Sequence, residues 1–175
     1  MSKTYALSDS SARVLFGLTV LLFLLLTVPT KAADGGRDLE TIKKALPDST
    51  AIANKVVYVD FWASWCMPCR KSFPWMALMQ AKYADSGLVF VTISVDRDAE
   101  AGKKYIEQER LSSISLFDPK GKLAEAFELK VMPTSFVFDK NGELQVVHEG
   151  FDPREKDEFE QKLVKLLHGE KLTDE

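Results

Sequence analysis

The 175-residue sequence predicts an α/β fold in which a mixed β-sheet is covered by helices on both faces. Three observations indicate this class. Apolar, strand-like runs alternate with helix-like segments along residues 55–127, which is typical of βα units. Asn141-Gly142 lies between two further apolar runs and predicts an antiparallel hairpin, because these residues adopt the positive φ values of a tight turn. Asp152-Pro153 combines a capping residue with a proline at the first helical position, and predicts a closing helix.

The first half of the domain predicts two buried strands joined by a long helix. Asp38–Leu46 predicts a short amphipathic lead-in helix, and the nearly uninterrupted apolar run Lys55–Phe61 suits a strand buried on both faces. A helix is expected from Cys66 to about Tyr83, with a kink at Pro74. Its expected apolar side comprises Trp75, Met76, Leu78, Met79 and Tyr83. Leu88–Val95 follows Gly87 as the second buried strand.

The second half predicts shorter elements. They are a helix at Glu100–Glu109, a strand at Ile114–Phe117, a helix at Leu123–Phe127, and hairpin strands at Ser135–Phe138 and Leu144–His148. The closing helix has an apolar stripe of Phe159, Leu163, Leu166 and Leu167, which is expected to face the core.

The N-terminus has the pattern of an export signal. Lys3 and Arg13 precede an uncharged apolar run, Val14–Val28, and a small-residue signal ends at Ala32-Ala33. The run is shorter than the roughly 20 residues that span a bilayer, so residues 1–32 are expected to be a signal peptide cleaved after Ala32. An uncleaved membrane anchor is the alternative. Either case exports the rest of the chain to a bacterial periplasm or the cell exterior, where disulfides persist; the periplasm is the compartment we expect.

The remaining residues are enough for one domain. We expect a linker and lead-in at residues 33–54, the α/β domain at 55–168 and a tail at 169–175, in a monomer. Removing residues 1–32 would change the formal charge from −3 to −5, because three basic residues and one acidic residue are lost. An acidic surface argues against nucleic acid as a partner.

The only two cysteines, Cys66 and Cys69, are three residues apart where the first buried strand gives way to a helix. Side chains at this spacing on a helix lie roughly 5–6 Å apart, so a modest tightening of the turn lets them form a disulfide. The first cysteine faces the unpaired N–H groups of the helix N-terminus, which favour thiolate over thiol. Cys66 is therefore the candidate nucleophile and Cys69 the resolving thiol.

Two other interpretations of the pair are less favoured. A structural zinc site needs four ligands, yet there is no second cysteine pair, and His148 and His168 lie near the C-terminal end. A purely structural disulfide across two residues would remove little chain entropy. Redox chemistry without a metal or an organic cofactor is favoured, and neither histidine is expected to take part.

The segment Val59–Cys69, the later Val131-Met132-Pro133-Thr134 and the Asn-Gly hairpin together resemble the thioredoxin superfamily, and within it the exported TlpA/ResA-like thiol-disulfide oxidoreductases. The similarity covers about residues 37–168 and implies a thioredoxin-like fold. It implies that Pro133 is cis and packs against the redox pair, which leaves the Met132 backbone free for an extended substrate. It also implies that Asp60 is a buried carboxylate behind Cys69. Such a group has a raised pKa and can relay the proton of the resolving thiol.

The resemblance places Trp62 in the core and makes Trp65 a partly exposed wall of the docking surface, with Met67 and Pro68 also expected to touch substrate. Two positions depart from the pattern. Thr92 stands where cytosolic thioredoxins carry a lysine beside the buried aspartate. Ser72 stands where relatives dedicated to cytochrome c maturation carry a glutamate, which weakens the case for apocytochrome c as substrate.

The expected function is reduction of protein disulfides by dithiol-disulfide exchange in the periplasm, with electrons from a membrane thiol conduit. An oxidant, an isomerase or a cytochrome c maturation thioredoxin remain alternatives, since related Cx2C proteins span about −270 to −120 mV. A peroxidase is disfavoured because Ser64 and Arg70 are poor substitutes for the threonine and arginine that it needs. A copper chaperone or a non-catalytic peptide-binding module are alternatives from other classes.

Overall fold

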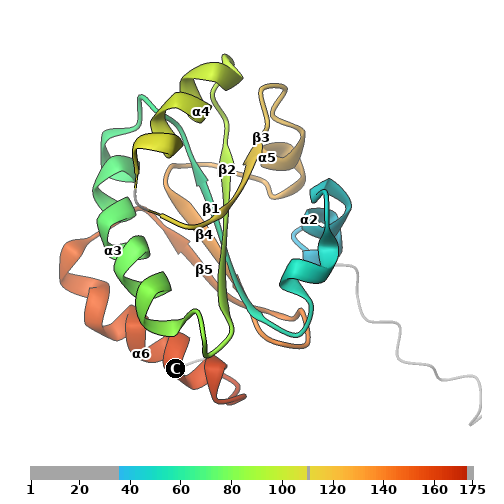
Figure 1. Ribbon diagram of the computed structural model, residues 1–175, viewed down its shortest axis with the longest axis vertical. Coiled ribbons are helices and arrows are strands. Elements are labelled where there is room, and N and C mark those ends of the chain that lie inside the picture. The colour runs from blue at the N-terminus through green and yellow to red at the C-terminus, as the bar shows by residue number, and fades with distance from the viewer. Residues whose placement is uncertain (1–35, 110, 173–175) are drawn as a thin grey trace, which may run out of the picture. The chain divides into compact units, whose positions relative to one another are not determined.

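A mixed five-stranded sheet forms the centre of the computed structural model, which describes residues 36–109 and 111–172. The strands lie in the order β3-β2-β1-β4-β5 (Figure 1). Their bounds are Val56–Trp62 for β1, Leu88–Ser94 for β2, Ile114–Phe117 for β3, Thr134–Phe138 for β4 and Leu144–Glu149 for β5. β1, β2 and β3 are parallel, whereas β4 runs antiparallel to β1 and to β5. The predicted βα units and hairpin are confirmed.

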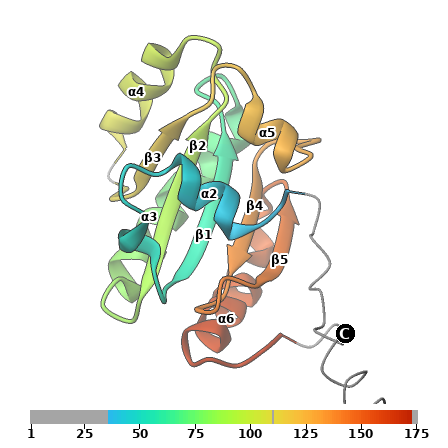
Figure 2. The same ribbon diagram turned by 90° about the vertical axis from the view of Figure 1, so that its right-hand side faces the viewer.

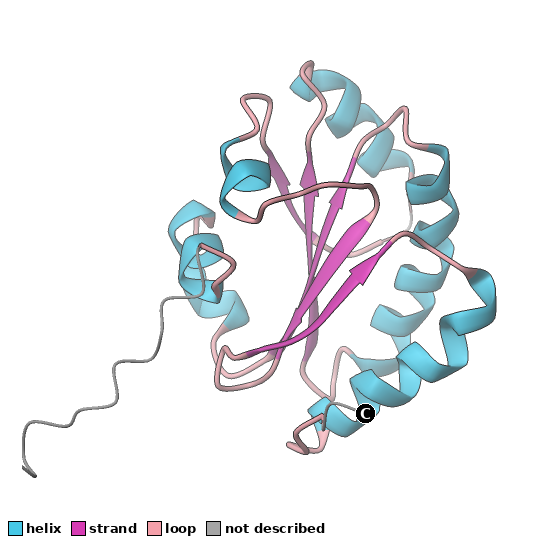
Figure 3. Ribbon diagram, turned by 180° about the vertical axis from the view of Figure 1, so that it is seen from behind, coloured by secondary structure: helices cyan, strands magenta, loops and turns pink. Residues whose placement is uncertain are grey.

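Helices cover both faces of the sheet, as Figure 1 and the view from behind in Figure 3 show. On one side lie α3 (Met67–Tyr83), α4 (Ala99–Gln108) and α6 (Lys156–Leu167). On the other lie α2 (Leu39–Ala45) and α5 (Lys122–Ala126), with α2 and α5 in front of the strands in Figure 2. The predicted thioredoxin-like arrangement of a mixed sheet between two helical layers is therefore present.

Two apolar cores result from the alternation of side chains along the buried strands. On β1, Tyr58 and Trp62 point toward α3 and join a core with residues of α3 and α6. Val57, Val59 and Phe61 point the other way, into the core beneath α2 and α5. Asp60 shares its face with Tyr58 and Trp62 because side chains alternate with a period of two. A carboxylate is thus placed in the apolar layer that also contains both cysteines.

Several details differ from the sequence-based expectations. The lead-in packs into the domain, since Leu39 and Ile42 of α2 and Ile52 of an unpredicted 3₁₀ turn, Ser49–Ile52, are buried. A 3₁₀ turn, Pro153–Glu155, precedes α6, and Asp152 caps it as expected. α3, in contrast, has nearly the expected range, with Pro74 inside it. Leu78, expected on the apolar side of this helix, is 60% exposed.

The predicted signal peptide or anchor, residues 1–32, lies outside the described residues, as do parts of the linker and of the C-terminal tail. Among the residues that are described, no helix is both long and apolar enough to cross a membrane. Within residues 36–109 and 111–172, no three or more His, Cys, Asp or Glu side chains gather in a way that could hold a metal ion.

Candidate active site

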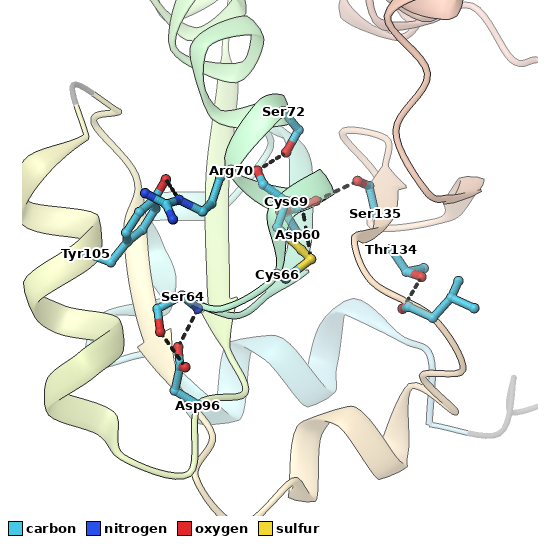
Figure 4. Close-up of a disulfide and its surroundings, with 11 residues drawn as sticks. Asp60, Ser64, Cys66, Cys69, Arg70, Ser72, Asp96, Tyr105, Thr134 and Ser135 are labelled. Atoms are coloured by element: carbon cyan, nitrogen blue, oxygen red, sulfur yellow. Dashed lines mark hydrogen bonds between the residues drawn. A yellow bond between two sulfur atoms is a disulfide. The ribbon is translucent and has the colours of Figure 1, made fainter.

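Cys66 and Cys69 form a disulfide at the start of α3, immediately after the carboxyl end of β1 (Figure 4). Cys66 is the N-cap residue of the helix, and its Sγ accepts a hydrogen bond of 3.3 Å from the Cys69 backbone N–H. This is the position at which unpaired N–H groups and the helix dipole stabilise a thiolate. The placement predicted for the redox pair is confirmed.

The two cysteines differ in exposure even with the disulfide formed. Cys66 is 6% exposed and Cys69 is completely buried. Around Cys66 the surface is apolar, because Trp65 is 68% exposed and Met67 is 58% exposed, and Pro68 is exposed as well. Of the two cysteines, Cys66 is therefore the one that retains exposed surface. Trp62, by contrast, is buried in the core, as predicted.

The Met132-Pro133 peptide bond is cis, as the resemblance implied. Pro133 is buried, and the partly buried Met132 packs against the apolar core that contains both cysteines. The loop is anchored on both sides, since Thr134 Oγ1 donates to the Val131 carbonyl at 2.9 Å and the Gly150 N–H donates to the Pro133 carbonyl at 2.7 Å. Among the described residues, no backbone hydrogen bond to the N–H or carbonyl of Met132 is found in the turns and loops. These two groups can therefore pair with an extended peptide.

Asp60 is fully buried, as the resemblance implied. Its Oδ1 accepts a hydrogen bond of 2.8 Å from Ser135 Oγ, whereas Oδ2 has no hydrogen-bond partner among the described residues. Burial removes water from the carboxylate and raises the pKa of Asp60 to about 7, while the Ser135 hydrogen bond opposes this rise. A carboxyl group with such a pKa can both accept and release a proton near neutral pH.

A row of polar side chains crosses the sheet at the level of Asp60. The strand register pairs Asp60 with Thr92 of β2 on one side and with Ser135 of β4 on the other. Beyond them, Thr92 pairs with Ser115 and Ser135 pairs with His148. Thr92 Oγ1 forms hydrogen bonds with Ser113 and Ser115 at 3.1 and 3.2 Å and none with Asp60. The two sides of Asp60 therefore differ: only Ser135 bonds to the carboxylate.

Sequence reasoning did not identify Ser135, or Tyr58, whose hydroxyl donates to Ser135 Oγ at 2.8 Å. The alternation along the predicted first strand could have placed Tyr58 on the face of Asp60. The position of Ser135 opposite Asp60 depends on the register between β1 and β4, which the sequence pattern does not specify.

The other residues singled out from the sequence lie around the site or away from it. Ser72 is buried on α3 and its hydroxyl donates to the Cys69 carbonyl at 2.8 Å. His148 lies on the edge strand β5, with its ring against Phe159, and His168 is the C-cap of α6. Neither histidine belongs to the turn that carries the disulfide.

A second buried carboxylate holds the loop that leads into the redox pair. Asp96 follows β2 and is 3% exposed. It accepts hydrogen bonds from the Ser64 N–H at 2.9 Å, from Ser64 Oγ at 2.8 Å and from Ser94 Oγ at 2.8 Å. Figure 4 shows Ser64 and Asp96 facing each other beside the disulfide. The contact fixes the backbone two residues before Cys66.

Comparison with protein families shows that residues 37–163 match the Redoxin family. The chain is 31% identical over 129 residues to the thiol-disulfide oxidoreductase ResA of Bacillus thuringiensis subsp. konkukian, an alignment covering 74% of this chain and 72% of that protein. It is 33% identical over 124 residues to the thioredoxin-like protein YneN of Bacillus subtilis, covering 69% of each chain.

Solved structures show the same similarity. A putative thiol:disulfide interchange protein DsbE from Chlorobium tepidum superposes with a TM-score of 0.65 and 42% identity, over 67% of this chain and 84% of that one. The pneumococcal exposed lipoprotein thioredoxin Etrx1 from Streptococcus pneumoniae superposes with a TM-score of 0.57 and 32% identity, over 67% of this chain and 89% of that one. The relatives and the disulfide at the helix start indicate the same chemistry.

Proposed function

Because the chain belongs to the Redoxin family, as a ResA-like thiol-disulfide oxidoreductase of the thioredoxin superfamily, we propose that it reduces disulfides of exported proteins in the periplasm. The observation that carries the proposal is the asymmetry of the redox pair. Cys66 is the helix N-cap and retains an exposed edge, and Cys69 is completely buried one turn later. This difference supports Cys66 as the residue that attacks a protein substrate.

The reaction begins when the Cys66 thiolate attacks one sulfur of a substrate disulfide. A bond forms between Cys66 Sγ and that sulfur, and the other substrate sulfur leaves as a thiolate that takes a proton from solvent. Stabilisation of the attacking thiolate comes from the N–H groups at the start of α3, and the product of this step is a mixed disulfide.

Cys69 completes the exchange by attacking Cys66 Sγ. The thiol first loses its proton, for which the carboxylate of Asp60, in the same buried layer, is the proposed acceptor. The new bond is the Cys66–Cys69 disulfide, and the bond between Cys66 Sγ and the substrate breaks. The second substrate sulfur leaves as a thiolate that takes a proton from solvent, and Asp60 returns the proton of Cys69 to solvent. The substrate has then gained two electrons and two protons, and the enzyme has lost them.

Substrate binding is assigned to the apolar surface around Cys66 and to the Met132-Pro133 loop. Trp65, Met67 and Pro68 supply exposed side-chain surface, and the Met132 backbone supplies hydrogen-bonding groups for an extended segment. Such a site would recognise the backbone of the substrate and apolar side chains next to its disulfide. It would accept protein disulfides without requiring a particular side-chain charge beside them.

Repeated turnover in an oxidising compartment needs a source of electrons. We assign this role to a membrane thiol conduit, which returns the Cys66–Cys69 disulfide to the dithiol by the same exchange in reverse. The periplasmic location is supported by the export signal in residues 1–32 and by the similarity to a protein described as an exposed lipoprotein thioredoxin.

Trapping of mixed disulfides tests the proposal. The wild-type chain should reduce insulin with dithiothreitol as donor, and Cys69→Ser should accumulate mixed disulfides through Cys66 that mass spectrometry identifies. Cys66→Ser is the matched control and should trap almost nothing. Equal trapping by both variants would show that the assigned roles are wrong. The equilibrium of the couple against glutathione measures the direction of exchange, and a strongly oxidising value would replace the reductase by an oxidant.

A further inference from the structure

A continuous chain of hydrogen bonds leads away from Asp60 on the side opposite Thr92. Ser135 Oγ donates to Asp60 Oδ1 at 2.8 Å, and the Tyr58 hydroxyl donates to Ser135 Oγ at 2.8 Å. All three side chains are buried, with Tyr58 3% and Ser135 2% exposed. Figure 4 shows Ser135 pointing from β4 toward Asp60. Buried polar groups of this kind act together, because each is cut off from water.

This series of hydrogen bonds follows from strand geometry. Tyr58 and Asp60 are two residues apart on β1 and so share one face, and the antiparallel register places Ser135 directly opposite Asp60. Tyr58 is a diagonal neighbour of Ser135, within the reach of an aromatic side chain. The Tyr58 ring is held by Phe90 and Phe159, with centroids 4.8 and 5.8 Å away. Its hydroxyl is therefore fixed in direction.

The direction of donation matters for the charge of Asp60. Because Tyr58 donates its only hydroxyl proton to Ser135, the Ser135 proton is free to be donated to the carboxylate. Both bonds point the same way and strengthen each other, which favours the ionised form of Asp60. They oppose the loss of hydration, which favours the neutral form.

The groups that face Asp60 from the packed elements are few. α3 contributes Cys66 and Cys69, β1 contributes Tyr58, and β2 and β4 contribute the hydroxyls of Thr92 and Ser135. Beyond Tyr58 lies a small cavity that is also lined by His148, Asp152, Glu155 and Lys156. Of the residues that line this cavity, Tyr58 is the one that belongs to the hydrogen bonds leading to Asp60.

We propose that Ser135 and Tyr58 are positioning residues that set the pH at which Asp60 accepts the proton of Cys69. The inference rests on the proposed function for its catalytic meaning, but the effect on Asp60 itself exists in the oxidised protein without turnover. Removing the Ser135 hydroxyl takes away the one hydrogen bond that the described residues make to the carboxylate. Removing the Tyr58 hydroxyl leaves that bond but no longer polarises it.

The structure offers a matched control in Thr92. It flanks Asp60 on β2 as Ser135 does on β4, and it is equally buried, yet its hydroxyl bonds to Ser113 and Ser115 instead. Thr92→Val removes a neighbouring hydroxyl without removing a hydrogen bond to the carboxylate. The variant separates the effect of the Tyr58–Ser135–Asp60 hydrogen bonds from a general loss of polarity around Asp60.

The experiment is a carbon-13 NMR titration of the Asp60 carboxyl in the oxidised full-length chain. Ser135→Ala should raise the midpoint by about one pH unit, and Tyr58→Phe should raise it by about half as much, since the loss of a hydrogen bond to a charge exceeds the loss of its polarisation. Thr92→Val should leave the midpoint unchanged, and Ser135→Thr should restore it. Tyr58→Phe preserves the shape of the core and provides the test if Ser135→Ala does not fold.

Kinetics give the second readout. The pH profile for release of substrate from the mixed disulfide should move upward in the same order as the titration midpoints. Unchanged midpoints in Ser135→Ala and Tyr58→Phe, or an equal shift in Thr92→Val, would overturn the inference even if the wild-type chain reduces insulin. A wild-type chain that fails to reduce insulin but shows the expected midpoints would contradict the proposed function and leave the control of Asp60 by Ser135 and Tyr58 standing.

Discussion

At the scale of single residues, the proposed chemistry depends on a carboxyl group that is buried where ionisation is unfavourable. Asp60 is fully buried, and only one of its two oxygens has a partner among the described residues. Burial shifts the pKa of Asp60 upward to about 7, into the range in which a proton acceptor is useful at physiological pH. Cys69, the proposed resolving thiol, lies in the same buried layer.

Asp60→Asn should slow resolution of the mixed disulfide roughly tenfold to a hundredfold, at the low end of what a positioned acid–base group contributes. The loss should be largest above pH 7, where the wild-type carboxylate is ionised, and smaller in acid, where it is already protonated. Single-turnover release of a chromogenic thiol from the Cys66 adduct measures the step. Wild-type rates from the variant across the neutral range would exclude a relay through Asp60.

The same residue predicts how stability varies with pH. Because the pKa of Asp60 rises from its ordinary 3.8 to about 7 on folding, the unfolded chain releases the proton at a lower pH than the folded chain does. The stability contributed by the protonated carboxyl is complete below pH 3.8 and is lost as the pH rises through about 7.

Asp60→Asn removes this titration. Between about pH 4 and about pH 8, the free energy of unfolding of the wild type should fall relative to that of the variant by up to about 4 kcal/mol. Urea unfolding at a series of pH values measures the difference, and the variant itself is the control for all other titrating groups. Parallel pH curves for the two chains would show that the carboxyl of Asp60 does not change its pKa on folding.

The residues of the site were unequally predictable from the sequence. Cys66, Cys69, Asp60 and the cis bond before Pro133 were recognised because each is part of a contiguous motif. Ser135 and Tyr58 were not, since their roles arise from the pairing of strands that are about 75 residues apart in the chain. A motif records neighbours in sequence, whereas this hydrogen-bonded chain depends on register.

At the scale of elements, the turn between β1 and α3 is held from outside by the end of β2. The carboxylate of Asp96 receives three side-chain and backbone donors from Ser64 and Ser94. α4 packs closely over the same place, because a Cβ on Gly102 would lie 2.4 Å from Ser94 Oγ. The loop before Cys66 is thus part of a packed junction of β1, β2 and α4.

Asp96→Ala should lower the free energy of unfolding by about 2–3 kcal/mol, because it leaves one buried and two partly buried donors without their acceptor, and it should also slow the attack by Cys66. Ser64→Ala should cost about 1 kcal/mol. Asp118→Ala is the matched control, since Asp118 is a similarly buried carboxylate that accepts the N–H groups of Lys122, Leu123 and Ala124 at the start of α5. Its loss should destabilise the fold but leave the attack rate unchanged; equal slowing in both variants would contradict a specific role for Asp96.

The long, strongly patterned elements were the most predictable. β1, β2, the hairpin strands and α6 follow the expected ranges to within a few residues, because continuous burial or a 3.6-residue stripe identifies them. The turn Ser49–Ile52 was not expected, since its polar residues resemble a loop and only Ile52 is buried. Leu78 is exposed although it belongs to the apolar side of α3. The apolar pattern of a helix therefore does not show which of its residues the rest of the protein buries.

At the scale of the whole molecule, the chemistry lies where the parallel strands end and the helical layer of α3 begins. The described residues form the unit that the Redoxin family match covers, and the predicted export signal precedes both. The reaction requires a compartment in which substrate disulfides exist. Export of the protein to that compartment is therefore required for the proposed activity.

Processing of the N-terminus is expected to release the domain after Ala32, because the apolar run Val14–Val28 is shorter than a typical bilayer span and a small-residue signal follows it. N-terminal sequencing of the chain recovered from the periplasm should read Ala33-Asp34 or begin within a residue or two of Ala33. A variant with Ala32→Lys is the control and should accumulate uncleaved in the membrane fraction. Recovery of intact wild-type chain from membranes would replace the signal peptide by an anchor, and would place the redox pair at the membrane surface, beside the proposed electron donor.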